Sequence, residues 1–227
     1  LGFGDEIDAA NLRVVHKRLA KPLGHRVASL RVDANGAWPA DEVVERAREL
    51  AHFGVRWIEQ PVRGTAGELA DLARRCPLGL IADESLVSEA DAAALLDGGM
   101  CVADGGGLPV CWNLRLSKNG GLRPTLRLAE RAVTAGVPVV VGCMVGESGI
   151  LSAAQRRLLQ CGIEPMHVEG NYGRWLLRGD VVRRSPRFGY GGRLKVLGGG
   201  GLGVRVDPRR LARSEEHTSE LQSLSHI

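Results

Sequence analysis

Aromatic side chains are scarce in this chain, because only 4% of its 227 residues are Phe, Trp or Tyr. A surface that stacks nucleic-acid bases needs such side chains, so we expect no nucleic-acid partner. The formal net charge of +4 does not change this expectation. Its arginines are scattered along helix-like stretches, as at Arg46 and Arg48 or at Arg127 and Arg131, and this pattern predicts solvated helix faces.

Long hydrophobic runs are missing as well. No apolar stretch approaches the roughly 18 residues of a membrane-spanning helix, and no signal-peptide pattern opens the chain. None of the five cysteines forms a Cys-x-x-Cys pair, which argues against a metal or redox motif. An odd number of isolated cysteines predicts reduced, mostly buried thiols. We therefore expect a cytoplasmic protein that does not bind a membrane.

Three short phrases each place a carboxylate directly after an apolar, β-prone run. They are VDANGAW at 32–38, WIEQP at 57–61 and IADES at 81–85, with the carboxylates Asp33, Glu59 and Asp83. The carboxylates are roughly 25 residues apart, the length of one strand–loop–helix–loop unit in a barrel of alternating strands and helices. The carboxyl ends of successive strands meet on one face of such a barrel, where active sites lie. Three oxygen donors without His or Cys suit a hard divalent cation, Mg²⁺ before Zn²⁺.

Each carboxylate also has a simpler interpretation when it is taken alone. Asp33 can belong to a turn with the residues that follow it, Glu59 can form a salt bridge at a strand end, and Asp83 can cap the next helix. Their order, spacing and common position at strand ends favour one shared site.

Apolar periodicity predicts an alternation of strands and helices along most of the chain. The expected strands are 27–32, 56–59, 78–82, 112–117, 137–141 and 165–168. The expected helices are 5–19, 40–53, 66–75, 88–96, 124–135 and 150–160. Residues 104–109 predict a loop or an insertion in this alternation. After Glu169 the pattern stops, and Gly/Arg-rich sequence runs to Leu211.

An open doubly wound sheet is the competing α/β architecture, and it would favour a nucleotide-binding protein. Such a sheet usually carries a Gly-rich phosphate loop after its first strand. Residues 198–203 read GGGGLG and fit G-x-G-x-x-G, but no predicted strand leads into them and no predicted helix follows. We interpret this segment as a loop.

Five motifs in a fixed order resemble the barrel domain of the enolase superfamily. They are VDANGAW, IEQP and ADES, then NLRLSKNGG at 113–121 and VGCMVGESGI at 141–150. The similarity points to the mandelate racemase/muconate lactonizing enzyme family, in the muconate-lactonizing branch that includes dipeptide epimerases and o-succinylbenzoate synthases. It implies an α/β fold, a partial (β/α)7β TIM-like barrel that lacks its first strands and its N-terminal capping domain.

The resemblance also divides the chain. Residues 1–170 would supply the third to eighth strands of the barrel, and residues 171–212 a C-terminal segment that closes the barrel or the capping region. Residues 213–227 include RSEEHTSELQS, which resembles the translation of a sequencing-library adapter. We interpret this tail as non-native, with a natural polar tail as the alternative. Because Leu1 is not Met and the first strands have no counterpart, we expect an N-terminal truncation.

The family pattern implies that Asp33, Glu59 and Asp83 bind Mg²⁺ at the ends of the third, fourth and fifth strands. Mg²⁺ held by three carboxylates would keep positions open for both oxygens of a substrate carboxylate. It would also stabilise the enediolate that forms when a base removes the α-proton.

The basic residues depart from the family pattern. Its Lys-x-Lys motif would lie immediately upstream of Leu1, and Arg115 replaces the Lys that ends the sixth strand. Arginine stays protonated, so it is a poor proton shuttle, although it can hold an anionic intermediate or a substrate carboxylate. Lys118, three residues further on, is a candidate substitute. Glu147 is a candidate for orienting the substrate or for accepting a hydrogen bond from the sixth-strand cation, with loop capping as the alternative.

Glu169 ends the eighth strand, where dipeptide epimerases place acidic residues that bind the substrate ammonium group, so it is a candidate substrate-binding residue. The expected function is Mg²⁺-dependent abstraction of the α-proton of a small-molecule carboxylate by an isomerase or a lyase. A racemase or epimerase, a cycloisomerase and a dehydratase all fit. The alternative is a catalytically inactive barrel fragment that only binds metal. The sequence names no substrate and leaves the oligomeric state open, with a homo-oligomer as one option.

Overall fold

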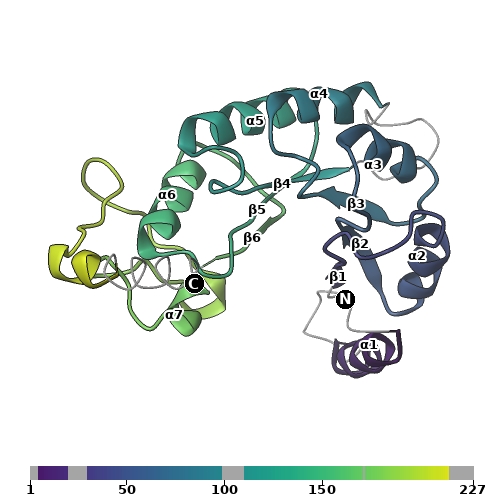
Figure 1. Ribbon diagram of the computed structural model, residues 1–227, viewed down its shortest axis with the longest axis horizontal. Coiled ribbons are helices and arrows are strands. Elements are labelled where there is room, and N and C mark those ends of the chain that lie inside the picture. Colours follow the sequence, from purple (N-terminus) through teal and green to yellow (C-terminus); the bar gives the residue numbers. More distant parts are fainter. Residues whose placement is uncertain (1–4, 20–29, 99–109, 171, 215–227) are drawn as a thin grey trace, which may run out of the picture. The chain divides into compact units, whose positions relative to one another are not determined.

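The computed structural model describes residues 5–19, 30–98, 110–170 and 172–214, and strands alternate with helices through most of these ranges (Figure 1). The strands are β1 (Leu30–Asp33), β2 (Val55–Glu59), β3 (Gly79–Ala82), β4 (Cys111–Leu114), β5 (Val139–Val141) and β6 (His167–Val168). The helices are α1 (Asp5–Leu19), α2 (Val43–His52), α3 (Ala66–Ala73), α4 (Glu89–Asp97), α5 (Leu122–Thr134), α6 (Gly149–Leu159) and the short α7 (Gly173–Leu176), and a 3₁₀ turn covers Tyr190–Gly192.

This element order confirms the predicted alternation within the described ranges. Most boundaries differ from the predicted ones by one to three residues, and the predicted strands 137–141 and 165–168 are shorter in the structure. The strand predicted at 112–117 ends three residues early, because β4 ends at Leu114. The chain turns directly after β4, where the carbonyl of Arg115 accepts hydrogen bonds from the amides of Lys118 and Asn119. The first residues of the predicted strand 27–32 and the predicted loop 104–109 lie outside the described residues.

The chain divides into two compact units that interleave in sequence. The first unit consists of Leu1–Leu114 and Arg127–Val140, and the second of Arg115–Leu126 and Val141–Ile227. The strands hydrogen-bond in the order β1-β2-β3-β4-β5-β6. Chain order in the sheet is what a barrel of alternating strands and helices requires.

The paired strands of the first unit have two different faces. β1 to β4 run parallel, and in this register Val32 is aligned with Ile58 and Ile58 with Leu80. These three side chains are almost fully buried. Helices α2 and α3 lie on one side of β1–β3 (Figure 1) and contact β2 and β3 respectively. The apolar residues of α2 and α3 thus shield one face of the sheet from water.

Trp57 fills the opposite face of the sheet. Its indole packs against a buried cluster of Ile81, Cys111 and Val140. Its register partner is Gly79, where an added Cβ would lie 2.4 Å from the indole ring. Only glycine leaves room for this tryptophan, so the Gly79–Trp57 pair fixes how closely β2 and β3 approach one another on this face.

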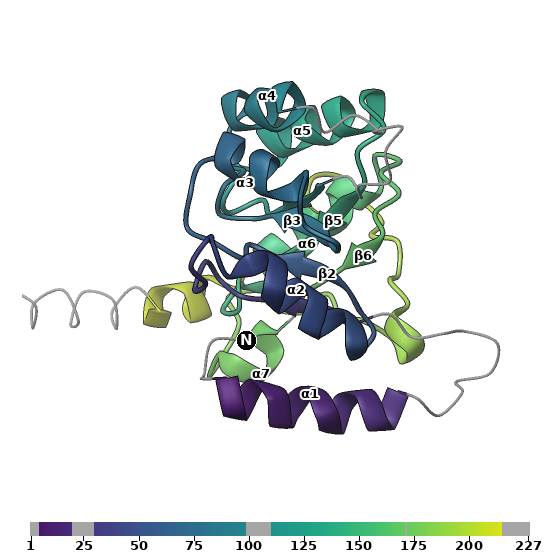
Figure 2. The same ribbon diagram turned by 90° about the vertical axis from the view of Figure 1, so that its right-hand side faces the viewer.

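Capping boxes fix the starts of α3 and α4. The Thr65 hydroxyl and the Glu68 carboxylate cap each other's backbone amides at α3, and Ser88 and Asp91 do the same at α4, which the sequence predicts to begin at residue 88. Within the first unit, α4 and the adjoining part of α5 lie side by side in both views (Figures 1 and 2). Arg127 Nε lies 2.6 Å from a carboxylate oxygen of Glu89 and links these two helices.

The second unit holds α6, α7 and an extended C-terminal segment. Apart from α7, the 3₁₀ turn and a final helix at 208–214, residues 172–214 form no helix and no strand longer than an isolated bridge. Within the described ranges, no helix combines the length and apolar character needed to cross a membrane.

Candidate active site

The predicted metal ligands lie at one edge of the sheet. Asp33, the last residue of β1, is aligned with Glu59, the last residue of β2, and Glu59 is aligned with Ile81 in β3. Asp83 lies two residues beyond Ile81. Asp83 directly follows the last residue of β3, so it lies at the same carboxyl-terminal edge, and continued alternation of side chains would direct it to the face of Asp33 and Glu59. The three carboxylates therefore share one end of the first unit's sheet, and Asp33 and Glu59 share one face of it.

Asn113 holds Glu59 on this face. Ile81 is aligned with Cys111, and Asn113 follows Cys111 by two residues, so its side chain belongs to the face of the carboxylates. The Asn113 side-chain amide donates a 2.5 Å hydrogen bond to one Glu59 oxygen, and Arg31 Nε lies 3.6 Å from the other oxygen. Glu59 is 3% exposed and Asn113 1% exposed. A buried carboxylate with one donor on each oxygen keeps a fixed orientation.

Hydrogen bonds from Gln60 hold the backbone around Asp83 in place. Its backbone has a positive φ of 35°, and its amide donates to the carbonyl of Ile81. Its side-chain oxygen accepts from the amides of Asp83 at 2.9 Å and Ser85 at 3.1 Å. Its side-chain nitrogen donates to the Ser85 hydroxyl and to the carbonyl of Val62. Beyond the end of β3, this fully buried side-chain amide takes the place of the hydrogen bonds that a neighbouring strand would make. It thereby fixes the backbone that carries the buried Asp83.

The turn after Asp33 is tied to the neighbouring strand. One carboxylate oxygen of Asp33 accepts from the amide of Asn35, and the amide of Gly36 donates to the carbonyl of Gln60. Asn35 and Gly36 both have a positive φ, and a Cβ on Gly36 would lie 2.7 Å from a side-chain carbon of Arg63. At Gly36, both the left-handed backbone and the close approach of the Arg63 side chain require glycine.

The donor set has the chemistry of a site for a hard cation, because three carboxylates lie at one edge of the sheet and two of them are nearly fully buried. Their like charges repel one another unless a cation lies between them. In the part of the chain that the structure describes, no three His, Cys, Asp or Glu side chains gather as a metal-holding group. The assignment of Asp33, Glu59 and Asp83 as metal ligands stays a prediction.

Arg115 and Glu147 belong to the second unit and contact the same residue. The Arg115 guanidinium donates to the sulfur of Met144 at 3.1 Å. One Glu147 oxygen accepts from the amide of Met144 at 2.9 Å and from the Ser117 hydroxyl at 3.1 Å. The structure thus brings the loops after β4 and β5 together around Met144. Both interpretations of Glu147 stay open, since it caps its own loop and also lies close to the loop of Arg115.

A buried thiol lies within the electrostatic influence of this pair. Burial, together with the Glu147 carboxylate, raises the pKa of Cys143 to about 11 against the opposing effect of the Arg115 guanidinium. The described cysteines 76, 111, 143 and 161 are free, and only Cys161 is exposed. The prediction of reduced, mostly buried thiols is confirmed for these four.

Lys118 and Glu169 lie in the second unit, each after the end of a strand. Lys118 belongs to the turn after β4, which the buried side chain of Asn119 closes by accepting from the amide of Arg115. Glu169 directly follows β6, and its amide donates to the carbonyl of Val141. The Gln155 side chain donates to the carbonyls of Glu169 and Gly142 and so connects the ends of β6 and β5. The catalytic role of Lys118 and the substrate-binding role of Glu169 stay predictions.

Residues 3–210 match the family described as enolase C-terminal domain-like. The chain belongs to this family. Muconate lactonizing enzyme from Pseudomonas putida has a similar structure, with a TM-score of 0.77 and 28% identity over 94% of this chain and 56% of that one. The match confirms the predicted enolase-superfamily resemblance and the α/β, TIM-barrel type of fold.

Two relatives of this enolase-like chain are isomerases. L-Ala-D/L-amino acid epimerase of Maribacter sp. is 34% identical over 207 residues, which are 90% of this chain and 54% of that protein. Muconate cycloisomerase 1 of Pseudomonas putida is 32% identical over 218 residues, which are 89% of this chain and 54% of that protein. The chain spans about half the length of the curated relatives it matches.

Sequence reasoning missed the roles of Gln60, Ser85 and Asn113. All three lie inside the motifs that carry the enolase resemblance, directly beside or near the predicted site residues. Their functions depend on hydrogen bonds between residues 23 to 54 positions apart. An uncharged polar side chain next to a strand-end carboxylate was the available signal, because buried amides and hydroxyls need partners.

Proposed function

We propose that this chain is the barrel part of a Mg²⁺-dependent enzyme that removes the α-proton of a small-molecule carboxylate. The alignment of Asp33 with Glu59 and of Glu59 with Ile81, two residues before Asp83, carries the proposal. The relatives named as an epimerase and a cycloisomerase support this class of reaction.

In the proposed site, each ligand is held by a neighbour. Glu59 and Asp83 would offer buried oxygens to the metal, and Asp33 would offer a third from the edge of the sheet. Asn113 orients Glu59, and Gln60 fixes the backbone of Asp83. When bound, Mg²⁺ would supply positive charge opposite the substrate carboxylate and make the neighbouring α-proton more acidic.

Arg115 favours a reaction that uses one base. Epimerisation by two bases needs a group on each face of the α-carbon that can lose its proton. A guanidinium stays charged, so Arg115 would hold an anionic group of the substrate while Glu147 orients its neighbourhood. Glu169 would bind a substrate ammonium group. Among the candidate reactions, β-elimination and cycloisomerisation therefore suit these residues better than racemisation.

Titration of Mg²⁺ into the chain by isothermal calorimetry tests the metal site. We expect one Mg²⁺ per chain and an affinity at least tenfold lower for Glu59→Gln and for Asp83→Asn, because each change removes a charged ligand. Glu45→Gln is the matched control, since this exposed glutamate on α2 pairs with Arg48 away from the sheet. Absence of binding, or equal affinity in all variants, would contradict the site.

Proton exchange tests the reaction. The chain is incubated in D₂O with Mg²⁺ and a set of small carboxylates that includes dipeptides and muconolactone, and loss of the α-proton signal is followed by NMR. We expect exchange that EDTA abolishes and Mg²⁺ restores. Exchange that survives EDTA would overturn the proposed mechanism. Site-specific Mg²⁺ binding without exchange would support the alternative of an inactive, metal-binding fragment.

A further inference from the structure

A cavity of the second unit is lined mainly by arginines. Its volume is about 470 Å³, within the range of small-molecule sites. The lining arginines come from α7, the chain after it and the final helix, and they are Arg174, Arg178, Arg183, Arg184, Arg187 and Arg210. Asp180 is the one carboxylate in the lining. The cavity therefore concentrates positive charge, and five of its six arginines lie between residues 174 and 187.

The Asp180 carboxylate is already engaged by backbone amides. Its two oxygens accept from the amide of Gly149, the first residue of α6, at 3.1 and 3.0 Å, and one of them also accepts from the amide of Val182 at 3.2 Å. Ser148 at the N-cap of α6 makes no side-chain capping bond, so Asp180 takes this role from a distant part of the chain. Its charge is directed at the positive end of a helix rather than at the arginines.

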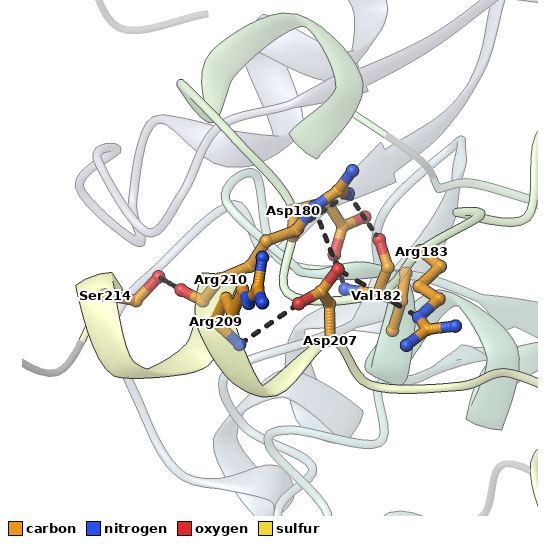
Figure 3. A network of polar contacts seen from close by, with 7 residues as sticks. All are labelled: Asp180, Val182, Arg183, Asp207, Arg209, Arg210 and Ser214. Carbon is orange, nitrogen blue, oxygen red and sulfur yellow. Dashed lines mark hydrogen bonds and ion pairs between the residues drawn. The ribbon is translucent and has the colours of Figure 1, made fainter.

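Asp207 neutralises part of the arginine set, as Figure 3 shows. Its carboxylate lies 3.7 Å from Arg210 Nε and 4.0 Å from Arg183 Nε, and it accepts from the amide of Arg209. Arg210 also donates to the carbonyls of Val182 and Asp180 at 2.9 and 3.4 Å. Arg210 is therefore an anchor of the cavity wall, and its charge is shared with Asp207.

Three further arginines of the lining have no such partner. Within the described residues, no carboxylate forms an ion pair with Arg178, Arg184 or Arg187, and all three side chains are exposed. Arg174 stacks its guanidinium over the ring of Trp175 at 4.6 Å, which leaves its charge uncompensated. Guanidinium groups on one wall repel one another, and an anion bound between them would relieve that repulsion.

We propose that this arginine-lined cavity binds a small polyanion that carries at least two phosphate or carboxylate groups. The planar fork of a guanidinium matches both oxyanions and holds them through paired hydrogen bonds. Several guanidinium groups around one cavity favour a ligand with several anionic groups over an ion with a single anionic group. Binding here involves residues of the second unit alone and does not depend on the proposed metal site.

Calorimetric titration of the 227-residue chain with tripolyphosphate and, separately, with citrate tests the proposal and distinguishes the two chemistries. We expect one ligand per chain for at least one of the two probes. The double variant Arg178→Gln/Arg184→Gln should weaken that binding at least tenfold. The matched control is Arg193→Gln/Arg205→Gln, which removes the same charge from exposed arginines outside the lining and should change the affinity less than twofold.

Three results would overturn the proposal. They are absence of binding by both probes, equal weakening in the two double variants, and several equivalent ligands per chain, since the last two indicate attraction by net charge alone. Both double variants change only exposed side chains, and their circular dichroism spectra should match that of the parent chain. Glu59→Gln should leave polyanion binding unchanged, which separates this result from the outcome for the proposed function.

Discussion

The carboxyl-terminal edge of β1–β4 and the C-terminal segment 172–214 satisfy their polar groups in opposite ways. At the strand edge, parallel pairing takes up most backbone groups, and a few buried uncharged side chains complete the set, as Gln60 and Asn113 do. In the C-terminal segment, strand pairing is reduced to isolated bridges such as Val182–Val206. In this segment, charged side chains make hydrogen bonds to backbone groups that a neighbouring strand would make in a sheet.

Arginines supply the missing hydrogen bonds in the C-terminal segment. Arg156 on α6 donates to the carbonyls of Lys195 and Arg187, and its neighbour Arg157 donates to three carbonyls between residues 197 and 199. Each guanidinium has five N–H donors, so one side chain can hold several loop carbonyls. The comparison shows that the buried side-chain amides of Gln60 and Asn113 fix the backbone and side chains of the candidate site. Guanidinium groups instead hold an irregular segment together, and other arginines within that segment leave positive charge at its surface.

The largest effect is expected when the strand edge loses Gln60. Gln60→Ala leaves the amides of Asp83 and Ser85 without their acceptor, and each buried orphan amide costs about 1–3 kcal/mol. We expect a loss of about 2–5 kcal/mol in the free energy of unfolding, measured by urea denaturation. The Mg²⁺ affinity should also fall at least tenfold, because the backbone of Asp83 loses its support.

Gln155→Ala is the matched control for this prediction. Gln155 is a similarly buried amide that joins the ends of β5 and β6 through two carbonyls. Its loss should lower stability by about 1–3 kcal/mol, since carbonyls tolerate a missing partner better than amides do. Mg²⁺ affinity should stay within twofold of the parent chain. Equal loss of Mg²⁺ affinity in both variants would mean that Gln60 acts only through overall stability.

A smaller and more local effect is expected for Arg156 in the C-terminal segment. The side chain is 6% exposed and lies over the ring of Phe188 at 6.0 Å. Arg156→Met keeps much of the packing volume but removes the donors to Lys195 and Arg187, with an expected cost of about 1–3 kcal/mol. Hydrogen exchange should accelerate between residues 182 and 206 and stay unchanged in β1–β4.

Arg48→Met is the control for Arg156→Met. Arg48 lies on the exposed face of α2 and pairs with Glu45 three residues away, with 63% and 67% of the two side chains exposed. Such surface pairs contribute about 0–1 kcal/mol, so exchange should change little anywhere. Accelerated exchange in β1–β4 after Arg156→Met would contradict the view that arginines stabilise the C-terminal segment only.

The regular part of the fold could be predicted from sequence because its signals are local. Apolar spacing predicted helices at 5–19 and 88–96, and the structure has α1 at Asp5–Leu19 and α4 at Glu89–Asp97 with Ser88 as its N-cap. The strand predicted to residue 117 was too long, because Asn119 closes a turn that apolar spacing does not reveal. The three carboxylates could be assigned to strand ends for the same local reason, since each directly follows an apolar run.

The remaining features depend on contacts between distant residues. Gln60 meets Ser85 only after β2 and β3 have paired, and Asn113 meets Glu59 only after β4 has joined them, so neither contact leaves a periodic pattern in the sequence. Residues 172–214 lack periodicity because side-chain bonds rather than ladders organise them. The sequence predicted only a Gly/Arg-rich segment there, and the structure shows that Arg210 supports the cavity wall.

The smallest expected effect is a pH dependence of stability that reports how deeply Cys111 is buried on the sheet face of Trp57. Burial, together with the nearby Glu59 carboxylate, raises the pKa of the Cys111 thiol to about 12 from an ordinary value of about 9, against the opposing effect of Arg31. Above pH 9 the unfolded chain loses this proton while the folded chain keeps it, so stability is complete below pH 9 and falls as the pH rises towards 12. Between pH 8 and pH 10 the thiol should remove about 1.4 kcal/mol from the free energy of unfolding.

Cys111→Ala should remove this contribution to the pH dependence, whereas Ile81→Val, in the same buried cluster, should lower stability at every pH and keep the slope. Denaturation at pH 8 and pH 10 measures both. Glu59→Gln should reduce the slope near pH 11 to 12, because the thiol then ionises more easily in the folded chain. If the free energy of unfolding fell with pH equally in the parent chain and in Cys111→Ala, water would reach this face of the sheet. The strand edge would then not be buried, and its contrast with the exposed arginine segment would be wrong.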